Sequence, residues 1–215
     1  NASARIAASV FAGGDLNVFA NKQNLRINAP TNVDSDLDTV FEGVSITNNG
    51  TIQNTHPDGD GRAIRFEGAV GLNIIATINN SGTISAGGDA IQVDTAANAG
   101  KVTITNSGTI TSNTGQALDF AGTTGAFELD LSNSATINGL ADDAVRIGSI
   151  GTILNFGSIN GGSAAGYAVN ADGIQFEDDA TGTVTNLNDA GGFISGDRHG
   201  INAGLNSNIT VNNGT

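Results

Sequence analysis

Two aspartates, Asp58 and Asp60, alternate with glycines in the stretch 56–61, which reads His-Pro-Asp-Gly-Asp-Gly. Closely spaced carboxylates are typical of loops that bind Ca²⁺, a hard cation that takes about six to eight oxygen ligands. The later acidic ligands of an EF-hand loop are missing, and no glycine-rich calcium-binding nonapeptide recurs. The sequence therefore predicts a protruding turn here. Calcium binding at Asp58 and Asp60 is the alternative, and we expect no other cofactor. Asp34, Asp36 and Asp38 form a similar alternating set.

Two pairs of adjacent acids, Asp142/Asp143 and Asp178/Asp179, are the candidates for acid–base chemistry. A glycosidase needs two carboxyl groups about 5–9 Å apart in one cleft. Adjacent residues of a strand point to opposite faces, so each pair supplies only one carboxylate per face. We therefore expect turn residues at these positions and predict no catalytic residue.

The two histidines, His56 and His199, are too far apart in the sequence repeat to share a zinc ion. The chain contains no cysteine, no Gly-x-Ser-x-Gly nucleophile motif and no phosphate-binding Gly-Lys-Ser/Thr step. Arg198 and His199 are a candidate for surface recognition, although a turn before the following glycine is the simpler interpretation. We expect that the chain is not an enzyme.

The elements that would position these residues come from a repeat. Its first phrase is an apolar residue, a gap, asparagine and usually Gly-Thr-Ile, as in Ile104-Thr-Asn106-Ser-Gly108-Thr-Ile110. Because side chains alternate along a strand, the apolar residues and the asparagine point the same way, into the core. Buried amides are costly unless hydrogen-bonded, so the asparagines are predicted to stack as an internal ladder. Its members are Asn48, Asn80, Asn106, Asn133, Asn155, Asn186 and Asn213.

A second phrase, small-apolar-polar-apolar, follows each asparagine phrase. Its first apolar positions, 64, 91, 118, 145, 174 and 201, are 27 residues apart except for one step of 29, a period typical of solenoids. Its outward residues form a mixed polar stripe: Arg65, Gln92, Asp119, Arg146, Gln175 and Asn202. Asp119 and Arg146 on successive coils could form an exposed ion pair worth at most about 1 kcal/mol. Phe41, Phe66, Phe120 and Phe176 fall on the inward register and are predicted to fill the core.

Composition selects the kind of solenoid. The chain has 31 glycines and only 13% charged residues, whereas helical repeats need long runs of strong helix formers. The sequence predicts an all-β fold, a right-handed parallel β-helix of about seven coils stacked about 4.8 Å apart. Residues 44–215 form the regular repeat, and residues 1–43 are expected to form irregular first coils or an N-terminal cap. The last phrase stops partway, so we expect a fragment of a longer chain.

The charge balance restricts the partners. The net charge is −13 with eight basic residues, which argues against nucleic acid and anionic membranes, because phosphate binding needs clustered Lys and Arg. The absence of cysteine suits a chain that is secreted unfolded and needs no disulfides.

The tandem phrases I-x-N-x-G-T-I and A-I-x-F, over about residues 40–215, resemble the passenger region of bacterial autotransporters. The resemblance implies an extracellular location at the bacterial cell surface, with export through a C-terminal outer-membrane barrel that the sequence given does not include. It also implies that the regular coils are mainly scaffold. The expected role is adhesion, with host or neighbouring-cell surface components or glycans as partners.

Two other roles stay open at this point. The first is a structural module that stacks end to end with itself into a filament or surface layer, through strand edges left open at its ends. The second, more distant, is a polysaccharide-active enzyme, because some lyases and hydrolases are also β-helices. Such an enzyme would carry clustered acids, calcium and a basic residue on one outer face.

Overall fold

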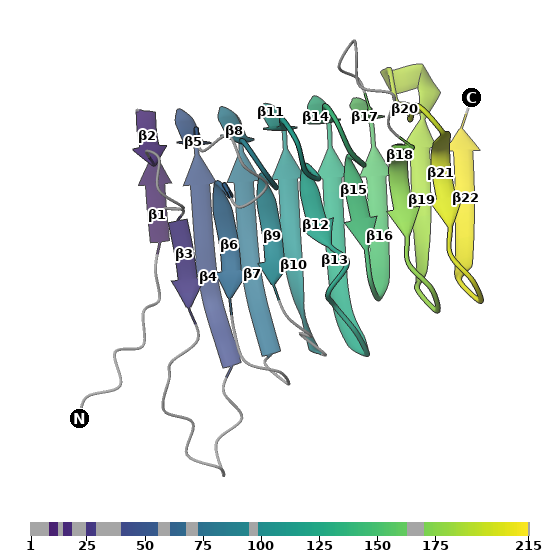
Figure 1. Ribbon diagram of the computed structural model, residues 1–215, viewed down its shortest axis with the longest axis horizontal. Helices are drawn as coiled ribbons and strands as arrows, with labels where there is room; N and C mark the ends of the chain where they lie inside the picture. The colour runs from purple at the N-terminus through teal and green to yellow at the C-terminus, as the bar shows by residue number, and fades with distance from the viewer. Residues whose placement is uncertain are drawn as a thin grey trace.

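The protein, seen in a computed structural model, is a stack of coils in which every turn of the chain adds one strand to each of three parallel sheets (Figure 1). The structure describes residues 9–12, 15–18, 25–28, 40–55, 61–67, 73–94, 99–162 and 170–214. The described helical structure is a single short 3₁₀ turn, η1 (Asn188–Ala190). The all-β parallel solenoid that the repeat predicts is therefore confirmed.

The first sheet, sheet A, has eight strands. In spatial order they are β1 (Ser9–Ala12), β4 (Val40–Asn48), β7 (Asn73–Asn80), β10 (Ala99–Asn106), β13 (Ala126–Asn133), β16 (Ile150–Asn155), β19 (Thr181–Leu187) and β22 (Asn208–Gly214).

The second sheet, sheet B, has seven strands. They are β2 (Asp15–Val18), β5 (Thr51–Asn54), β8 (Thr83–Ala86), β11 (Thr109–Ser112), β14 (Thr136–Gly139), β17 (Ser158–Gly161) and β20 (Phe193–Ser195).

The third sheet, sheet C, also has seven strands. They are β3 (Leu25–Asn28), β6 (Ile64–Glu67), β9 (Ile91–Asp94), β12 (Leu118–Phe120), β15 (Val145–Ile147), β18 (Asp172–Phe176) and β21 (His199–Ala203). The prediction of about seven coils differs slightly from the structure, because sheet A has one strand more than the other two.

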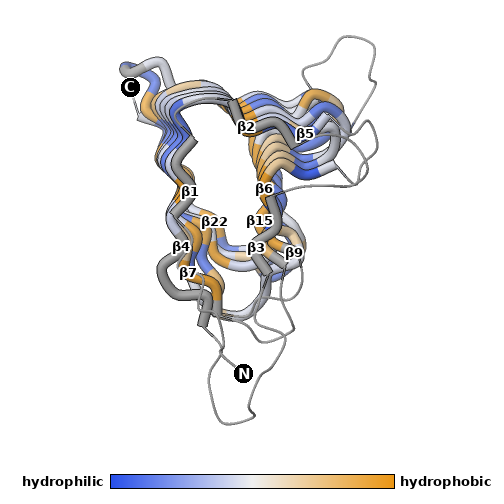
Figure 2. The backbone as a smooth tube through the Cα atoms, turned by 90° about the vertical axis from the view of Figure 1, so that its left-hand side faces the viewer, coloured by the Kyte–Doolittle hydropathy of each residue, from blue (hydrophilic) through white to orange (hydrophobic). Residues whose placement is uncertain are grey.

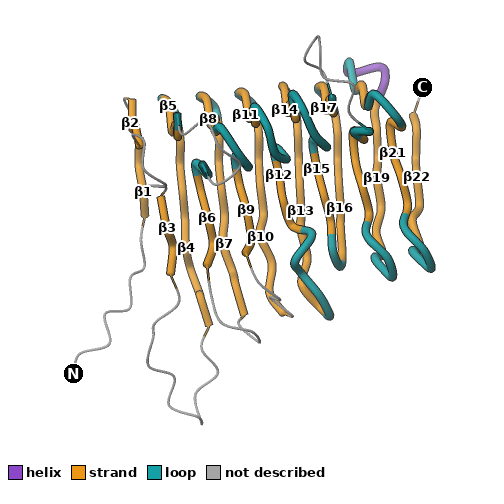
Figure 3. Tube along the Cα trace, in the orientation of Figure 1, coloured by secondary structure: helices purple, strands orange, loops and turns teal. Residues whose placement is uncertain are grey.

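Strands β1, β2 and β3 come from the segment 1–43 that matches the repeat poorly. They pair in parallel with β4, β5 and β6, so these short pieces follow the same three-sheet order as the regular coils (Figure 3). The bounds proposed for an N-terminal unit and a regular unit stay a prediction.

The core consists of side chains packed between the inward faces of the three sheets, and the coils lie over one another along one axis (Figure 2). Strands β5, β8, β11, β14 and β17 all alternate between half-buried and buried residues, as one-sided strands must. Five isoleucines that are register partners in sheet B are fully buried: Ile52, Ile84, Ile110, Ile137 and Ile159. Ile194, the next in the column, is partly buried. Phe66, Phe120 and Phe176 are also fully buried, which confirms their inward register, whereas the side chain of Phe41 lies outside the described residues.

Large and small residues compensate for one another within the core. Gly151 and Gly182 are register partners in sheet A, where the preceding strand β13 has Leu129. A Cβ at Gly182 would lie 2.8 Å from the ring of Phe176 and 2.2 Å from the Gly151 carbonyl oxygen. The two glycines therefore make room for the Phe176 ring, as dense packing in cores requires.

Candidate functional site

The predicted asparagine ladder is present at the corner between sheets A and B. Each side-chain amide donates from Nδ2 to Oδ1 of the asparagine one coil further along. The six bonds are Asn48 to Asn80 (2.7 Å), Asn80 to Asn106, Asn106 to Asn133, Asn133 to Asn155 and Asn155 to Asn186 (2.8 Å each), and Asn186 to Asn213 (2.9 Å).

The ladder amides also bind the backbone of the corner that follows them. Asn106 Nδ2 donates to the carbonyl oxygens of Gly108 (3.1 Å) and Thr136 (3.2 Å). Ladder members from Asn48 to Asn186 are at most 7% exposed, so their hydrogen bonds replace water completely. Because donors and acceptors are matched within the protein, the ladder holds the coils together and offers nothing to a ligand.

Polar residues of the sheet C strands, and of the turns that lead into these strands, bring several charged groups together. They form two neighbouring rows, which we call the sheet C stripe. One row is the polar position foreseen in the sequence, described here as Arg65, Gln92, Asp119, Arg146, Gln175 and Asn202. The other row lies three residues earlier and consists of Arg62, Asp89, Gln116, Asp143, Asp172 and His199.

Gln92 joins two carboxylates on neighbouring coils. Its Nε2 donates to Asp89 Oδ2 (2.9 Å) and to Asp119 Oδ2 (2.8 Å), while its Oε1 accepts from Arg62 Nε (2.8 Å). Asp89 Oδ1 accepts from the backbone N–H of Gln116 on the next coil (3.0 Å). The two carboxylates are close enough for acid–base catalysis, but the glutamine between them occupies the space that a substrate would need.

Arg146 does not pair with Asp119, so that part of the sequence prediction is wrong. The two residues are register partners, but the Arg146 guanidinium turns to the opposite neighbour. Its Nε donates to Glu177 Oε1 (2.9 Å) and lies 3.6 Å from Asp143 Oδ2. Glu177 lies one residue beyond β18. Arg146 therefore interacts with two acids, Glu177 and Asp143, and not with Asp119 alone.

Asp172 organises the C-terminal end of the stripe and places the predicted recognition pair, Arg198 and His199. Its fully buried carboxylate accepts from Arg198 Nε (3.1 Å) and Nη2, from Asn202 Nδ2 (3.0 Å), and lies 3.0 Å from His199 Nδ1. The side chains of Arg198 and His199 are 40% and 51% exposed. The buried Asp172 carboxylate therefore holds both side chains, which are partly exposed to solvent.

Three aspartates of the stripe have displaced pKa values. Burial raises the pKa of Asp89 to about 6, and the charge of Asp119 adds to this shift. Burial also raises the pKa of Asp143 to about 6, partly opposed by the backbone hydrogen bond from Asp172. Burial acts in the same sense on Asp172, but hydrogen bonds from Arg198, Asn202 and His199 outweigh it and hold the pKa of this carboxyl below its usual value.

The paired acids lie in turns. Asp142 Oδ1 accepts from the N–H of Asp143 (2.8 Å), and Asp143 Oδ1 accepts from the N–H of Asp172 (2.6 Å). Asp178 Oδ1 accepts from the N–H of Leu205 (2.7 Å), and Asp179 has a positive φ of 61°, which aspartate tolerates in turns. The carboxylates of Asp143, Asp178 and Asp179 therefore link one coil to the next, whereas that of Asp142 binds within its own turn.

The candidate calcium residues Asp58 and Asp60 lie outside the described residues, as do His56 and the set Asp34, Asp36 and Asp38. Among the residues that the structure does describe, no group of three or more His, Asp or Glu side chains is arranged to hold a metal ion. Calcium binding at Asp58 and Asp60 therefore stays a prediction.

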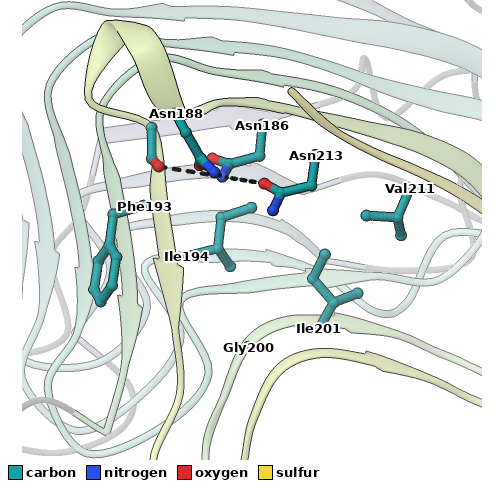
Figure 4. Close-up of a pocket in the computed structure, with 9 residues that line it drawn as sticks. Asn186, Asn188, Phe193, Ile194, Gly200, Ile201, Val211 and Asn213 are labelled. Carbon is teal, nitrogen blue, oxygen red and sulfur yellow. Dashed lines mark hydrogen bonds between the residues drawn. The ribbon is translucent and has the colours of Figure 1, made fainter. Parts of the chain in front are cut away.

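A hollow of about 480 Å³ opens at the last described coil (Figure 4). Asn186 and Asn213 of the ladder lie on one side of it, and Ile194, Ile201 and Val211 supply its apolar lining. It lies at the end of the core.

The sequence analysis named Asp143 and His199 of the second row but missed Asp89 and Asp172, and it did not recognise that these residues form a row. The signal was present, because each residue directly precedes the small residue of the second phrase and recurs with the same period. Their burial could not be foreseen, because Asp89 and Asp143 lie in turns, where alternation gives no direction, and Asp172 is the first residue of β18.

Comparisons with protein-family models, with curated proteins and with solved structures found no match to this chain. Within the described residues no helix has the length and apolar character needed to cross a membrane.

Proposed function

We propose that the chain is a segment of an extracellular bacterial surface protein, in which the β-solenoid is a scaffold for adhesion to cells or matrix. One observation carries the proposal. The interior repeats nearly unchanged from β4 to β19, with the same asparagine and isoleucine columns, whereas the outward residues differ from sheet to sheet. A fold built this way separates mechanical support from surface recognition.

Two further points support a scaffold over a catalyst. The repeat phrase resembles autotransporter passenger regions, whose regular coils are mainly support. In addition, the buried carboxylates of the sheet C stripe bind backbone N–H groups of neighbouring coils, so their chemistry is used in stacking.

The proposal is tested by coating beads with the purified chain and measuring their attachment to immobilised matrix proteins, epithelial cells and bacterial cells. We expect attachment that saturates with bead number and is blocked by soluble chain. Beads coated with an unrelated protein of similar negative charge are the control. Attachment no stronger than that control on all three surfaces would contradict the proposal.

A second candidate function is end-to-end self-assembly, favoured by the apolar groups of the last described coil. Three large apolar side chains are exposed there: Phe193 (56%), Leu205 (70%) and Val211 (49%). Phe193 and Val211 also line the hollow (Figure 4). The ladder would not continue across such a contact between copies, because Ala12 faces Asn48 at the ladder position of β1. Apolar contact would have to supply the association.

Light scattering and electron microscopy across protein concentration, with and without calcium, test this second candidate. Open-ended fibres that grow with concentration would support it. Short rods in every condition would exclude it, and fibres that form only with calcium would give Asp58 and Asp60 a role.

A further inference from the structure

The outer face of sheet B has a row of hydroxyl groups along the solenoid axis, one per coil. Strand register places Thr51, Thr83, Thr109, Thr136 and Ser158 directly beside one another. We call these five residues the hydroxyl row. With strands about 4.8 Å apart, the row is about 19 Å long. All five residues are half-buried.

These hydroxyls have no partner within the part of the chain that the structure describes. Other hydroxyls do: Ser112 donates to the Gly88 carbonyl oxygen (2.6 Å) and Ser149 to that of Gly125 (2.6 Å). A hydroxyl can donate one hydrogen bond and accept two. The row therefore presents an ordered series of unused donors and acceptors.

A second polar row lies beside the first, two residues further along each strand. Part of it is already organised, because Ser195 Oγ donates to Asn160 Oδ1 (3.0 Å) and Asn160 Nδ2 donates to Asn138 Oδ1 (2.9 Å). Held in this way, these groups lose little conformational entropy when a ligand binds.

Six of the seven strands of sheet B carry no charged residue, and the seventh, β2, has Asp15 at the register position of Thr51. None of the strands β5, β8, β11, β14, β17 and β20 contains an ionisable residue, although the chain has a net charge of −13. The corresponding row on sheet A is interrupted by Asp130, which pairs with Lys101 at 2.8 Å. A charged partner would lose hydration of its ions on these strands, which offer no opposite charge. An anionic partner would also be repelled by the net negative charge of the chain. An uncharged partner has neither cost.

An aromatic ring terminates the hydroxyl row. Phe193 is the register partner of Ser158 and is 56% exposed. A flat apolar ring in line with hydroxyl groups matches a sugar, which has C–H groups on its ring faces and hydroxyls around its edge.

We propose that sheet B binds a neutral, linear polysaccharide that lies parallel to the solenoid axis, with its hydroxyls on the hydroxyl row and one sugar ring against Phe193. The ligand is linear because the match repeats in one direction only, coil by coil. It is neutral because the strands beneath it are. This inference rests on the proposed function, since it names one partner class for an adhesive scaffold.

Affinity electrophoresis tests the proposal, with β-glucan, glucomannan or dextran in the gel and polygalacturonate as the anionic comparison. The test variant, Thr83→Val/Thr109→Val/Thr136→Val, removes three hydroxyls and keeps the β-branched shape. The matched control, Thr77→Val/Thr103→Val/Thr183→Val, makes the same change on sheet A. Phe193→Ala tests the ring separately.

We expect at least one neutral polysaccharide to retard the wild-type chain and polygalacturonate not to do so. The sheet B variant should bind at least about tenfold more weakly, because three hydrogen bonds are lost, and Phe193→Ala should also weaken binding. The sheet A control should bind as the wild type does. Absence of retardation in all three neutral gels, or equal losses in the two triple variants, would overturn the proposal. Neither result would contradict bead attachment, which tests the scaffold function by itself.

Discussion

Sheets B and C enclose the same core, yet their outer faces have opposite chemistry. On sheet C, charged and amide side chains bind one another and the backbone of adjacent coils, as Gln92 does between Asp89 and Asp119. On sheet B, uncharged hydroxyls stand in a row and bind nothing within the described structure. The comparison shows that a polar surface is not in itself a binding surface. What distinguishes the two is whether its hydrogen bonds are already made.

The largest effect is expected in the interior that both faces share. Asn106→Leu leaves Asn80 Nδ2 without its ladder acceptor and Asn133 Oδ1 without its ladder donor, and it removes the hydrogen bonds from Asn106 to the Gly108 and Thr136 carbonyls. At about 1–3 kcal/mol per unsatisfied buried group, the free energy of unfolding should fall by about 2–6 kcal/mol. Urea denaturation measures it, with the adjacent outward substitution Thr105→Val as the control. A loss below about 1 kcal/mol would show that the ladder is dispensable.

On sheet C, Asp172→Ala should have the next largest effect. It removes the fully buried carboxylate that binds Arg198, His199 and Asn202. Since these partners are part-exposed and can rebind water, we expect a loss of about 2–3 kcal/mol in unfolding free energy. Urea denaturation would again decide, and an unchanged midpoint would mean that the sheet C contacts contribute nothing to stability.

The sheet C stripe also predicts how stability varies with pH. Folding raises the pKa of Asp89 and Asp143 from 3.8 to about 6, so the folded state resists their ionisation. Their destabilising effect is therefore full above pH 6 and disappears as both become protonated. Between pH 7 and pH 5 the free energy of unfolding should rise by about 1–3 kcal/mol. Below pH 4 the contribution of Asp172, whose pKa is lowered, should be lost.

Urea midpoints measured across this pH range would reveal that rise. The double variant Asp89→Asn/Asp143→Asn keeps the side-chain shape and should flatten it. A wild-type chain whose stability falls steadily from pH 7 to pH 5 would contradict the buried, protonatable state of these two carboxyls.

Sheet B should give the smallest change in stability. Because the hydroxyl row makes no hydrogen bond to the residues that the structure describes, Thr109→Val should alter the unfolding free energy by no more than about 0.5 kcal/mol. Thermal unfolding compared with the wild type would measure it. A loss above about 1 kcal/mol would mean that the Thr109 hydroxyl is already in use, and the contrast between the two faces would be wrong.

The fold could be predicted from the sequence because the alternation of side chains and the period of the repeat can both be read directly from the order of the residues. The spacing of Ile104, Asn106 and Ile110 is enough to predict that they point inward. The ladder follows, because a buried amide needs a hydrogen-bond partner. The side-chain contacts of the stripe are not local. Arg146 binds Glu177 and not Asp119, and the Asp172 carboxylate is bound by Arg198, His199 and Asn202 of the next coil. The repeat does not encode these contacts.

The contrast between sheets B and C is tested most directly by bead attachment of the wild-type chain, the triple valine variant of sheet B and a sheet C variant, Asp119→Asn, on the same cell and matrix surfaces. We expect saturable attachment by the wild type and by Asp119→Asn, and a clear loss for the sheet B variant. If the wild type attaches no better than a protein of similar charge, the scaffold function is contradicted. If all three attach equally, adhesion does not use the hydroxyl row.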